Sequence, residues 1–509
     1  MAKTQFETSV FGIHLGNTSA CLASYKDGKA QIIANDVGDR ITPAVVAVTD
    51  TEKVVGTSAK AGIARNNTST VVHNKRLLNN NVDDETLSNI GNKTPYKITK
   101  DGNVLKYILK HGERTFSVTP ESVAVSIFTK LFEIASSSGK FDNDLKAVLC
   151  CPLNYPQSSR CTLMRAAEEA GFEVLQVISE PAATALAYSI GVQNPEEELM
   201  CLVYRVGGAT LDVSIVEERS GMYSVRQSTH LPDLGGDRFT TMLAEYLAEE
   251  YRKKCKLDPF ESRRSMAKLT SAAETCKHVL STMGTAHCFV ESLCEGVDFS
   301  YNITRARFES LISPIIHQYI NPIKEILQKA KMENKRIQKV LLSGGCVKVP
   351  KLQQVLREVF PNAEFVNSLS PDEVIAIGAA RHASYLSSAI DPECQHLWRE
   401  IPAVAAPIFF RGNGIDEQCI IRGMTPVPVR RCKKFFVEPA EEAFVELVEI
   451  PTDVLTTRGI LGKLSLGQVL TQVEVCLEVS VNSVGGLSAV LTDSSGQKKA
   501  TLKLDPPQE

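Results

Sequence analysis

A chain of 509 residues is too long for one hydrophobic core, so we expect roughly two to four domains. With 43% hydrophobic and 23% charged residues and no apolar run of membrane-spanning length, the composition is that of a soluble protein and excludes a membrane-spanning one. A net charge of -3 gives no general attraction to DNA or other nucleic acid. The 14 cysteines are scattered without a CxxC pair, which favours buried, reduced thiols of a cytosolic protein over a disulfide framework or a metal site.

The chain begins with a predicted β-hairpin at residues 10–30, whose turn is Gly16, Asn17 and Thr18. The same order recurs at residues 202–216, where the turn contains Gly207, Gly208 and Thr210. Such turns let backbone N–H groups point to one centre, which suits a phosphate. A single glycine turn between strands is usually only a hairpin, but a repeated one indicates two lobes that hold a nucleotide between them.

Between the hairpins, strands alternate with helices. We predict helices at 120–138 and 156–170 and strands at 146–151 and 174–178. This alternation is typical of an α/β sheet covered on both faces. Glu180 then stands at the end of a strand and begins an alanine-rich helix, whose small residues allow close helix approach.

The second half adds a glycine turn at Gly235 and Gly236 before a helix at 238–256. The next helix, 265–283, carries a polar stripe at helical spacing, which by itself favours a solvated helix surface over a binding site. A third glycine pair, Gly344 and Gly345, follows the strand 340–343, and a last helix is predicted at 372–386. From residue 402 the pattern has period two, best seen at 473–481, which predicts a separate antiparallel β domain with no helix after it.

Five segments together resemble the nucleotide site of the heat shock protein 70 chaperones, which have the actin-like ATPase fold; they are HLGNTSAC, ISEPAATALAYSIG, VYRVGGATLDVSIV, LLSGGCVKVPKLQ and SPDEVIAIGAA. The C-terminal segments MTPVPVRR, ILGKLSL and VEVCLEVSVNSVGG resemble the peptide-binding sandwich of that family. The resemblance implies two duplicated lobes around a nucleotide cleft over residues 1–388, a linker at 389–401, and a β-sandwich without a helical lid at 402–509.

The resemblance also assigns site residues. It implies phosphate contact for Gly16, Asn17, Thr18, Gly207, Gly208, Thr210 and Gly236. It implies adenosine contact for Glu274, Lys277, His278, Ser281, Gly344, Gly345, Lys348 and Asp372. Lys75 matches a lysine that approaches the γ-phosphate, and Glu180 and Asp212 match carboxylates near the metal and the attacking water. Pro152 and Arg160 match a pair that relays the nucleotide state between domains.

Three departures from the family pattern determine the predicted function. The family has Asp, Thr and Asp where this chain has His14, Asn17 and Arg205. A guanidinium cannot be a metal ligand, and both missing aspartates belong to the magnesium shell. We therefore expect ATP binding with hydrolysis slowed by several powers of ten, leaving Lys75, Glu180 and Asp212 as catalytic remnants and no resident metal.

The role of Arg205 stays open between two alternatives. Its guanidinium could neutralise the phosphates in place of part of the metal, because its planar fork pairs with phosphate oxygens. It could instead form only an ion pair with Asp212 or Glu180, since a buried charge must be paired. A strict magnesium requirement for ATP binding would reject the first alternative.

The peptide-binding half departs from the family as well, because the linker region has no aliphatic run and no lid follows the sandwich. These features resemble short, ribosome-associated members that pair stably with a J-domain protein and assist nascent chains. We expect a cytosolic, ATP-binding chaperone subunit with these partners. The main alternative is an active, ATP-hydrolysing peptide-binding chaperone; an actin-like filament protein or a sugar kinase is disfavoured by the sandwich.

Overall fold

The computed structural model describes residues 10–78, 82, 87–88, 90–91, 94–102, 104–139, 145–190, 199–219, 222–388, 403–404, 406–423, 425–449, 459–493 and 497–505. The chain forms two compact units, Met1–Trp398 and Arg399–Glu509. The expected linker at 389–401, which contains the only tryptophan, Trp398, lies outside the described residues. Within the described part of the chain, no helix is long and apolar enough to cross a membrane.

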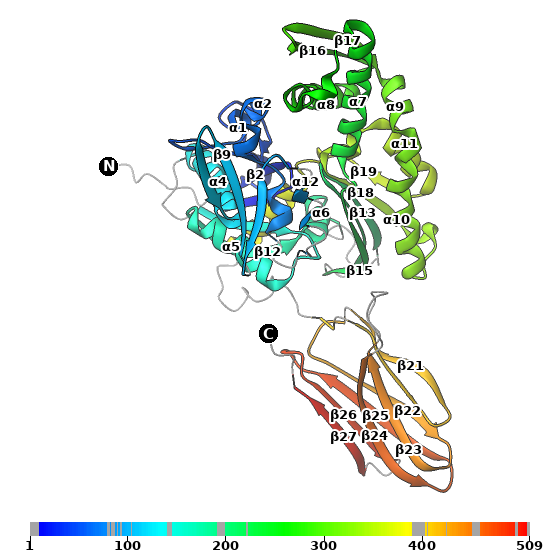
Figure 1. Ribbon diagram of the computed structural model, residues 1–509. Coiled ribbons are helices and arrows are strands. Elements are labelled where there is room, and N and C mark those ends of the chain that lie inside the picture. The colour runs from blue at the N-terminus through cyan, green and yellow to red at the C-terminus, as the bar shows by residue number, and fades with distance from the viewer. Residues whose placement is uncertain are drawn as a thin grey trace. The chain divides into compact units, whose positions relative to one another are not determined.

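The first lobe of the larger unit is built on a mixed sheet of order β12-β11-β1-β2-β3, with β4 also paired to β2 (Figure 1). Strand β1 is antiparallel to β2 and parallel to β11. The strands are β1 (Val10–Leu15), β2 (Ser19–Lys26), β3 (Lys29–Ile32), β4 (Thr42–Pro43), β11 (Leu145–Cys151) and β12 (Phe172–Ser179). Two smaller sheets, β6-β5-β7 and β10-β9-β8, consist of β5 (Val46–Val48), β6 (Lys53–Val55), β7 (Thr70–Val71), β8 (Lys97–Asp101), β9 (Val104–His111) and β10 (Arg114–Val118).

The second lobe repeats this topology in a sheet of order β15-β14-β13-β18-β19. Strand β13 is antiparallel to β14 and parallel to β18, as β1 is to β2 and β11. The strands are β13 (Leu199–Val206), β14 (Thr210–Arg219), β15 (Met222–Pro232), β18 (Lys339–Ser343) and β19 (Glu364–Val366). The predicted α/β fold with two duplicated lobes is therefore confirmed.

Helices cover both faces of the first sheet. On one face, α4 (Pro120–Ser137) and α5 (Gln157–Glu169) bury Phe11 and Ile13 of β1. On the other face, α6 (Glu180–Ala187) and α12 (Val374–Ser388) pack against Val10. The short helices α1 (Thr57–Ala61) and α2 (Ile63–Asn66) complete this lobe.

Helix α6 lies between the sheets of the two lobes, since Ala183 belongs to the cluster with Val10 and Ala185 to the cluster with Val203. Its small residues let α12 approach closely, because a Cβ on Gly378 would lie 1.8 Å from the carbonyl oxygen of Ala183. The predicted close helix approach is thus confirmed.

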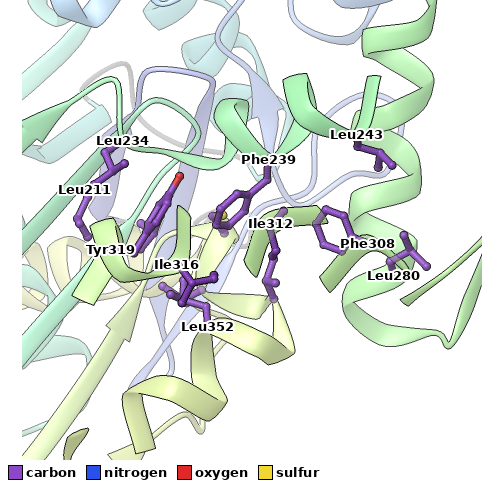
Figure 2. Packing of buried hydrophobic residues seen from close by; sticks show 14 of the residues in the cluster. Leu211, Leu234, Phe239, Leu243, Leu280, Phe308, Ile312, Ile316, Tyr319 and Leu352 are labelled. Carbon is purple, nitrogen blue, oxygen red and sulfur yellow. The ribbon is translucent and has the colours of Figure 1, made fainter. Parts of the chain in front are cut away.

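The largest apolar cluster of the second lobe lies on the face of its sheet that is turned away from α6. In this cluster the ring centres of Phe239 and Tyr319 lie 4.8 Å apart (Figure 2). The Tyr319 hydroxyl donates to the carbonyl of Gly235 at 2.9 Å, which ties the core to the glycine turn. The elements around this cluster are α7 (Gly236–Cys255), α8 (Arg263–Thr282), β16 (Thr285–Cys294), β17 (Val297–Thr304), α9 (Arg305–Ile312), α10 (Ile316–Lys329) and α11 (Pro350–Val359).

The smaller unit is a sandwich of two four-stranded antiparallel sheets, β21-β20-β23-β24 and β22-β25-β26-β27. Val475, Leu477 and Val479 of β25 are buried between the sheets, as their period-two spacing predicts. In the described residues from 403 to 505 no helix occurs. The strands are β20 (Ile408–Gly412), β21 (Ile415–Ile421), β22 (Val429–Val437), β23 (Ala440–Glu449), β24 (Gly459–Val469), β25 (Val473–Val481), β26 (Leu487–Asp493) and β27 (Lys498–Leu504).

Candidate functional site

Strand alternation turns two of the departing residues toward helix α6. In β1, His14 lies on the same face as Val10, which packs on α6 and α12. In β13, Arg205 lies on the same face as Val203, which packs against Ala185 of α6. Each residue lies two positions before the turn glycine of its hairpin, Gly16 or Gly207. Both side chains therefore lie beside the first turn of α6.

The two predicted phosphate turns have the same hydrogen bond. The Gly16 amide donates to the Ser19 carbonyl at 2.8 Å, and the Gly207 amide donates to the Thr210 carbonyl at 2.9 Å. The turns also meet, because a Cβ on Gly208 would lie 2.3 Å from Cγ2 of Thr18. Only glycine allows this approach of the two lobes.

Glu180, the first residue of α6, is the centre of the charged cluster. Its carboxylate is 3% exposed and accepts a hydrogen bond from Lys75 Nζ at 2.6 Å. His14 Nε2 lies 3.1 Å from the same oxygen, and Arg205 Nε lies 3.2 Å from the other one. The structure therefore gives this single carboxylate three basic neighbours from three different segments.

These neighbours set the protonation states. Burial alone would raise the pKa of Glu180, but the charges of Arg205 and Lys75 hold it well below its usual range. Burial lowers the pKa of His14 to about 4, against the opposing effect of Glu180. Near neutral pH, an ionised Glu180 therefore faces two permanent cations and a neutral imidazole.

Arg205 also pairs with the second carboxylate. Its Nη1 donates to Asp212 Oδ2 at 2.6 Å and to the Thr210 hydroxyl at 3.3 Å. On the other side, His230 Nδ1 lies 2.5 Å from Asp212 Oδ1. Burial would raise the pKa of Asp212, but the hydrogen bond from His230 and the charge of Arg205 lower it. The ion-pair alternative for Arg205 is thus observed with both candidate partners at once.

The donor set does not fit a magnesium shell. Mg²⁺ is bound by carboxylates and water in near-octahedral geometry, whereas the oxygens of Glu180 and Asp212 already contact ammonium, guanidinium and imidazole groups. Among the described residues, no group of three or more His, Cys, Asp and Glu side chains could hold a metal ion.

Lys75 is fixed at both ends. It lies in the 3₁₀ helix Asn74–Leu77, and its carbonyl accepts a hydrogen bond from the Tyr155 hydroxyl at 2.6 Å. The carbonyl of Tyr155 in turn accepts from Arg160 Nε at 3.4 Å. Pro152 lines a cavity of about 40 Å³ together with Glu180, Arg205 and Asp212. Pro152 therefore shares a cavity with the charged cluster, and Arg160 is connected to Lys75 through Tyr155.

The third glycine pair packs against the second hairpin. A Cβ on Gly344 would lie 2.3 Å from the carbonyl oxygen of Val206, and its φ is 85°. The Gly236 amide donates to the Gly207 carbonyl at 2.9 Å, which places the start of α7 at the same turn. In the 3₁₀ helix Gly345–Lys348, Lys348 Nζ donates to Asp372 Oδ2 at 2.8 Å.

Helix α8 carries the predicted adenosine residues. Lys277 Nζ is buried and donates to the Gly236 carbonyl and the Thr240 hydroxyl, at 3.1 and 2.7 Å. Burial and the charge of Lys277 lower the pKa of His278, and Lys348 acts in the same direction. The Ser281 hydroxyl donates to the Lys277 carbonyl of its own helix at 3.0 Å. Glu274 Oε2 lies 2.8 Å from Lys60 Nζ of α1, across the two lobes.

Comparison of the sequence with known proteins identifies the family of this chain. A family model described as Hsp70 protein matches residues 10–505. This chain belongs to the Hsp70 family. It is similar to Heat shock 70 kDa protein 14 of Danio rerio, with 43% identity over 74% of this chain and 75% of the relative. The same protein of Bos taurus is 41% identical over 83% of this chain and 84% of its own length, and that of Homo sapiens is 42% identical over 74% of each.

Membership in Hsp70 identifies the larger unit as the actin-like ATPase fold of this family, and it is followed by a strand-rich region whose described residues, from 403 to 505, contain no helix. Hsp70 proteins are chaperones that bind nucleotide and generally act with J-domain proteins and substrates. The chain is accordingly an Hsp70-family chaperone with a nucleotide-binding fold.

Several residues of this Hsp70 site were not predicted. His230 could not be assigned to the site from the sequence, because its contact with Asp212 depends on the register between β14 and β15. Arg76, next to the predicted Lys75, bridges the lobes by donating to Asp233 at 2.6 Å and to the Ala209 carbonyl at 3.1 Å. Tyr155 gave no sequence signal.

Proposed function

We propose that this Hsp70-family chain holds ATP with little or no hydrolysis and, as one subunit of a stable pair with a J-domain protein, supports folding of nascent polypeptides at the ribosome in the cytosol. The observation that carries the proposal is the pairing of Arg205 with both remaining carboxylates, at 3.2 and 2.6 Å. Arg205 cannot bind a metal, and its ion pairs engage the two carboxylates that would do so, so hydrolysis loses its metal site.

Buried cations and two backbone turns gather where a triphosphate would bind. Lys75 and Arg205 supply the cations, which are paired with Glu180 and Asp212, and the turns at 16–18 and 207–210 would present further backbone N–H groups to the phosphates. The residues of α8 and the segment 344–348 would hold the nucleoside, with Asp372 fixed by Lys348 and Ser370. ATP would supply a triphosphate that competes with Glu180 and Asp212 for these cations.

ATP affinity measured with magnesium and with a chelator tests the role of Arg205. We expect the two dissociation constants to agree within about threefold, because the cations are built into the protein. Arg205→Asp should weaken binding in chelator by about 100-fold or more and restore a dependence on magnesium. A strict magnesium requirement in the unmodified chain would reject this role.

The alternative is an active ATPase, and it rests on Lys75, Glu180 and Asp212 all remaining at the site. Single-turnover phosphate release separates the two functions: turnover at rates typical of the family would overturn the nucleotide-holding proposal. Combining His14→Asp with Arg205→Asp should raise hydrolysis by about 100-fold, because it returns two acidic groups to the magnesium shell.

The partners are tested by purification. A tagged chain should copurify with one J-domain protein through size exclusion, and both should sediment with ribosomes in a salt gradient until the salt concentration screens the contact. Absence from the ribosomal fraction at low salt would remove the ribosome from the proposal without affecting the nucleotide site.

A further inference from the structure

Two cysteine thiols meet on the outer face of the sandwich. Cys432 of β22 and Cys476 of β25 have their Sγ atoms 2.6 Å apart. In the antiparallel register Cys432 is opposite Glu478 and Cys476 is opposite Lys434, so the cysteines are diagonal neighbours on one face. Their strand neighbours Val475 and Leu477 point into the core, which leaves both thiols on the solvent side.

Both thiols can be reached from solvent. Cys432 is exposed and Cys476 is half-buried. Among the cysteines that the structure describes, Cys419 is the other exposed one, whereas Cys150, Cys151 and most others are buried. The pair therefore differs from the buried, inert thiols that the composition predicted for this chain.

We propose that Cys432 and Cys476 form a reversible oxidation site that is converted to a disulfide by exchange with a small-molecule disulfide. One of the two cysteines loses its proton and attacks one sulfur of that disulfide, which forms a mixed disulfide and releases one small thiol. The other cysteine then loses its proton and attacks the protein sulfur of the mixed disulfide, which forms the protein disulfide and releases the second small thiol. Two protein thiols and one small disulfide thus yield one protein disulfide and two small thiols.

The proximity of the two sulfurs determines the second step. Once one cysteine carries the mixed disulfide, the sulfur of the other is the nearest nucleophile, because the two Sγ atoms already lie 2.6 Å apart in the reduced chain.

The charges on this face are mixed in sign. Lys434 stands directly opposite Cys476 and Glu478 directly opposite Cys432, and Arg430 is paired with Glu478 at 2.6 Å. Arg431 and Lys433 alternate with Cys432 along β22 and point to the other face, where Lys433 Nζ lies 5.9 Å from the centre of the Phe410 ring. The site therefore requires no particular charge on the small disulfide.

The disulfide would join the edge strand β22 to its neighbour and enclose β23 and β24 of the opposite sheet in one covalent loop. Such a loop restricts the unfolded sandwich and stabilises the folded one. Because both thiols can be reached from solvent, the bond would be open to reduction as well as to oxidation, which is the behaviour of a switch rather than of a permanent structural link.

Oxidised glutathione, added to the full chain, tests the proposal. We expect the intact mass to fall by two hydrogen atoms, a non-reduced digest to link the peptides of residues 432 and 476, and dithiothreitol to reverse both. The oxidised chain should unfold at a temperature higher by about 5 °C in the transition of the sandwich.

Three variants make the test specific. Cys432→Ser and Cys476→Ser should each leave a stable glutathione adduct on the remaining cysteine without an internal cross-link, and the matched surface control Cys419→Ser should form the cross-link unchanged. The proposal is overturned if the unmodified chain links to Cys419, forms only bonds between chains, or stays reduced while iodoacetamide labels Cys432 and Cys476.

Discussion

The hairpins of the two lobes share one backbone arrangement but differ in the charge of their site residues. The row across the first sheet at the site is Cys21, His14 and Cys150, whereas the equivalent row across the second sheet contains His230, Asp212 and Arg205. His14 is neutral and contacts one carboxylate, while Arg205 is charged and contacts two. One position has lost its acidic charge and the other has inverted it, so the second lobe carries most of the change.

The largest expected effect is a difference in stability between Arg205→Asp and His14→Asp. Removing Arg205 leaves Glu180 and Asp212 facing a third carboxylate in a buried site, which should cost about 3 to 5 kcal/mol. His14→Asp should cost about 1 to 2 kcal/mol, because Lys75 remains beside Glu180. Urea unfolding of the full chain, followed by the signal of the larger unit, measures both.

Arg252→Asp on the exposed surface of α7 is the matched control for charge reversal, and it should change stability by less than about 1 kcal/mol. Equal losses in the two site variants would contradict the unequal roles of the lobes.

The second prediction concerns pH and separates His14 from Arg205. Burial lowers the pKa of His14 from 6.5 to about 4, so between these values the unfolded chain binds a proton that the folded chain does not. Stability is therefore highest above the unfolded pKa and falls as the pH drops, by about 3 kcal/mol at pH 4. Thermal unfolding of wild type and His14→Asn across this range measures the effect.

In His14→Asn, the decrease in stability that comes from protonation of His14 should be absent. The same slope in both proteins would mean that other groups, such as the surface carboxylates, account for the acid sensitivity.

The third prediction compares the turns at Gly208 and Asn17, which are equivalent in the duplication. Gly208→Ala should cost about 1 to 3 kcal/mol and weaken ATP binding about tenfold, because its Cβ would overlap the Thr18 side chain. Asn17→Ala should leave the stability nearly unchanged, since the structure gives its buried Oδ1 no hydrogen-bond partner in the described part of the chain. Urea unfolding measures the stability of both variants, and calorimetric titration with ATP measures the affinity of Gly208→Ala.

Adding Thr18→Gly to Gly208→Ala removes the overlapping atoms and should recover most of the lost affinity. If it does not, the contact between the turns is not the cause.

The smallest expected effect lies where the lobes meet away from the phosphate turns. Lys60→Ala removes the ion pair with Glu274, whose side chains are 38% and 28% exposed, and should cost less than about 1 kcal/mol. ATP release, measured by stopped flow, should become at most about threefold faster. A larger effect would place the main closure of the lobes at α1 and α8 rather than at the charged cluster.

Much of the fold was readable because it is encoded locally. The turn residues at Gly16 and Gly207 revealed the duplication, and the alternation at 473–481 revealed the sandwich. Helix ends differed by one or two residues where caps decide them: α8 begins at Arg263, not at residue 265, because the Ser262 hydroxyl accepts from the Ser265 amide.

The contacts of the site were less predictable, because they depend on which strands pair and which faces meet. The sequence left the partner of Arg205 open between Asp212 and Glu180, and the structure pairs it with both. His230 joins the cluster from the edge strand β15, and no local pattern indicated that register. The site residues implied by family resemblance stay predictions until a nucleotide is bound.

The double anchoring of Lys75 affects the thermodynamics of binding. A lysine that is free in solution loses up to about 2 kcal/mol of rotamer entropy when it is immobilised. Here the amino group is held by Glu180 and the backbone by Tyr155, both at 2.6 Å, and the side chain is 1% exposed. The Lys75 side chain is already ordered in the folded chain. Binding of a triphosphate therefore costs no further rotamer entropy of this lysine.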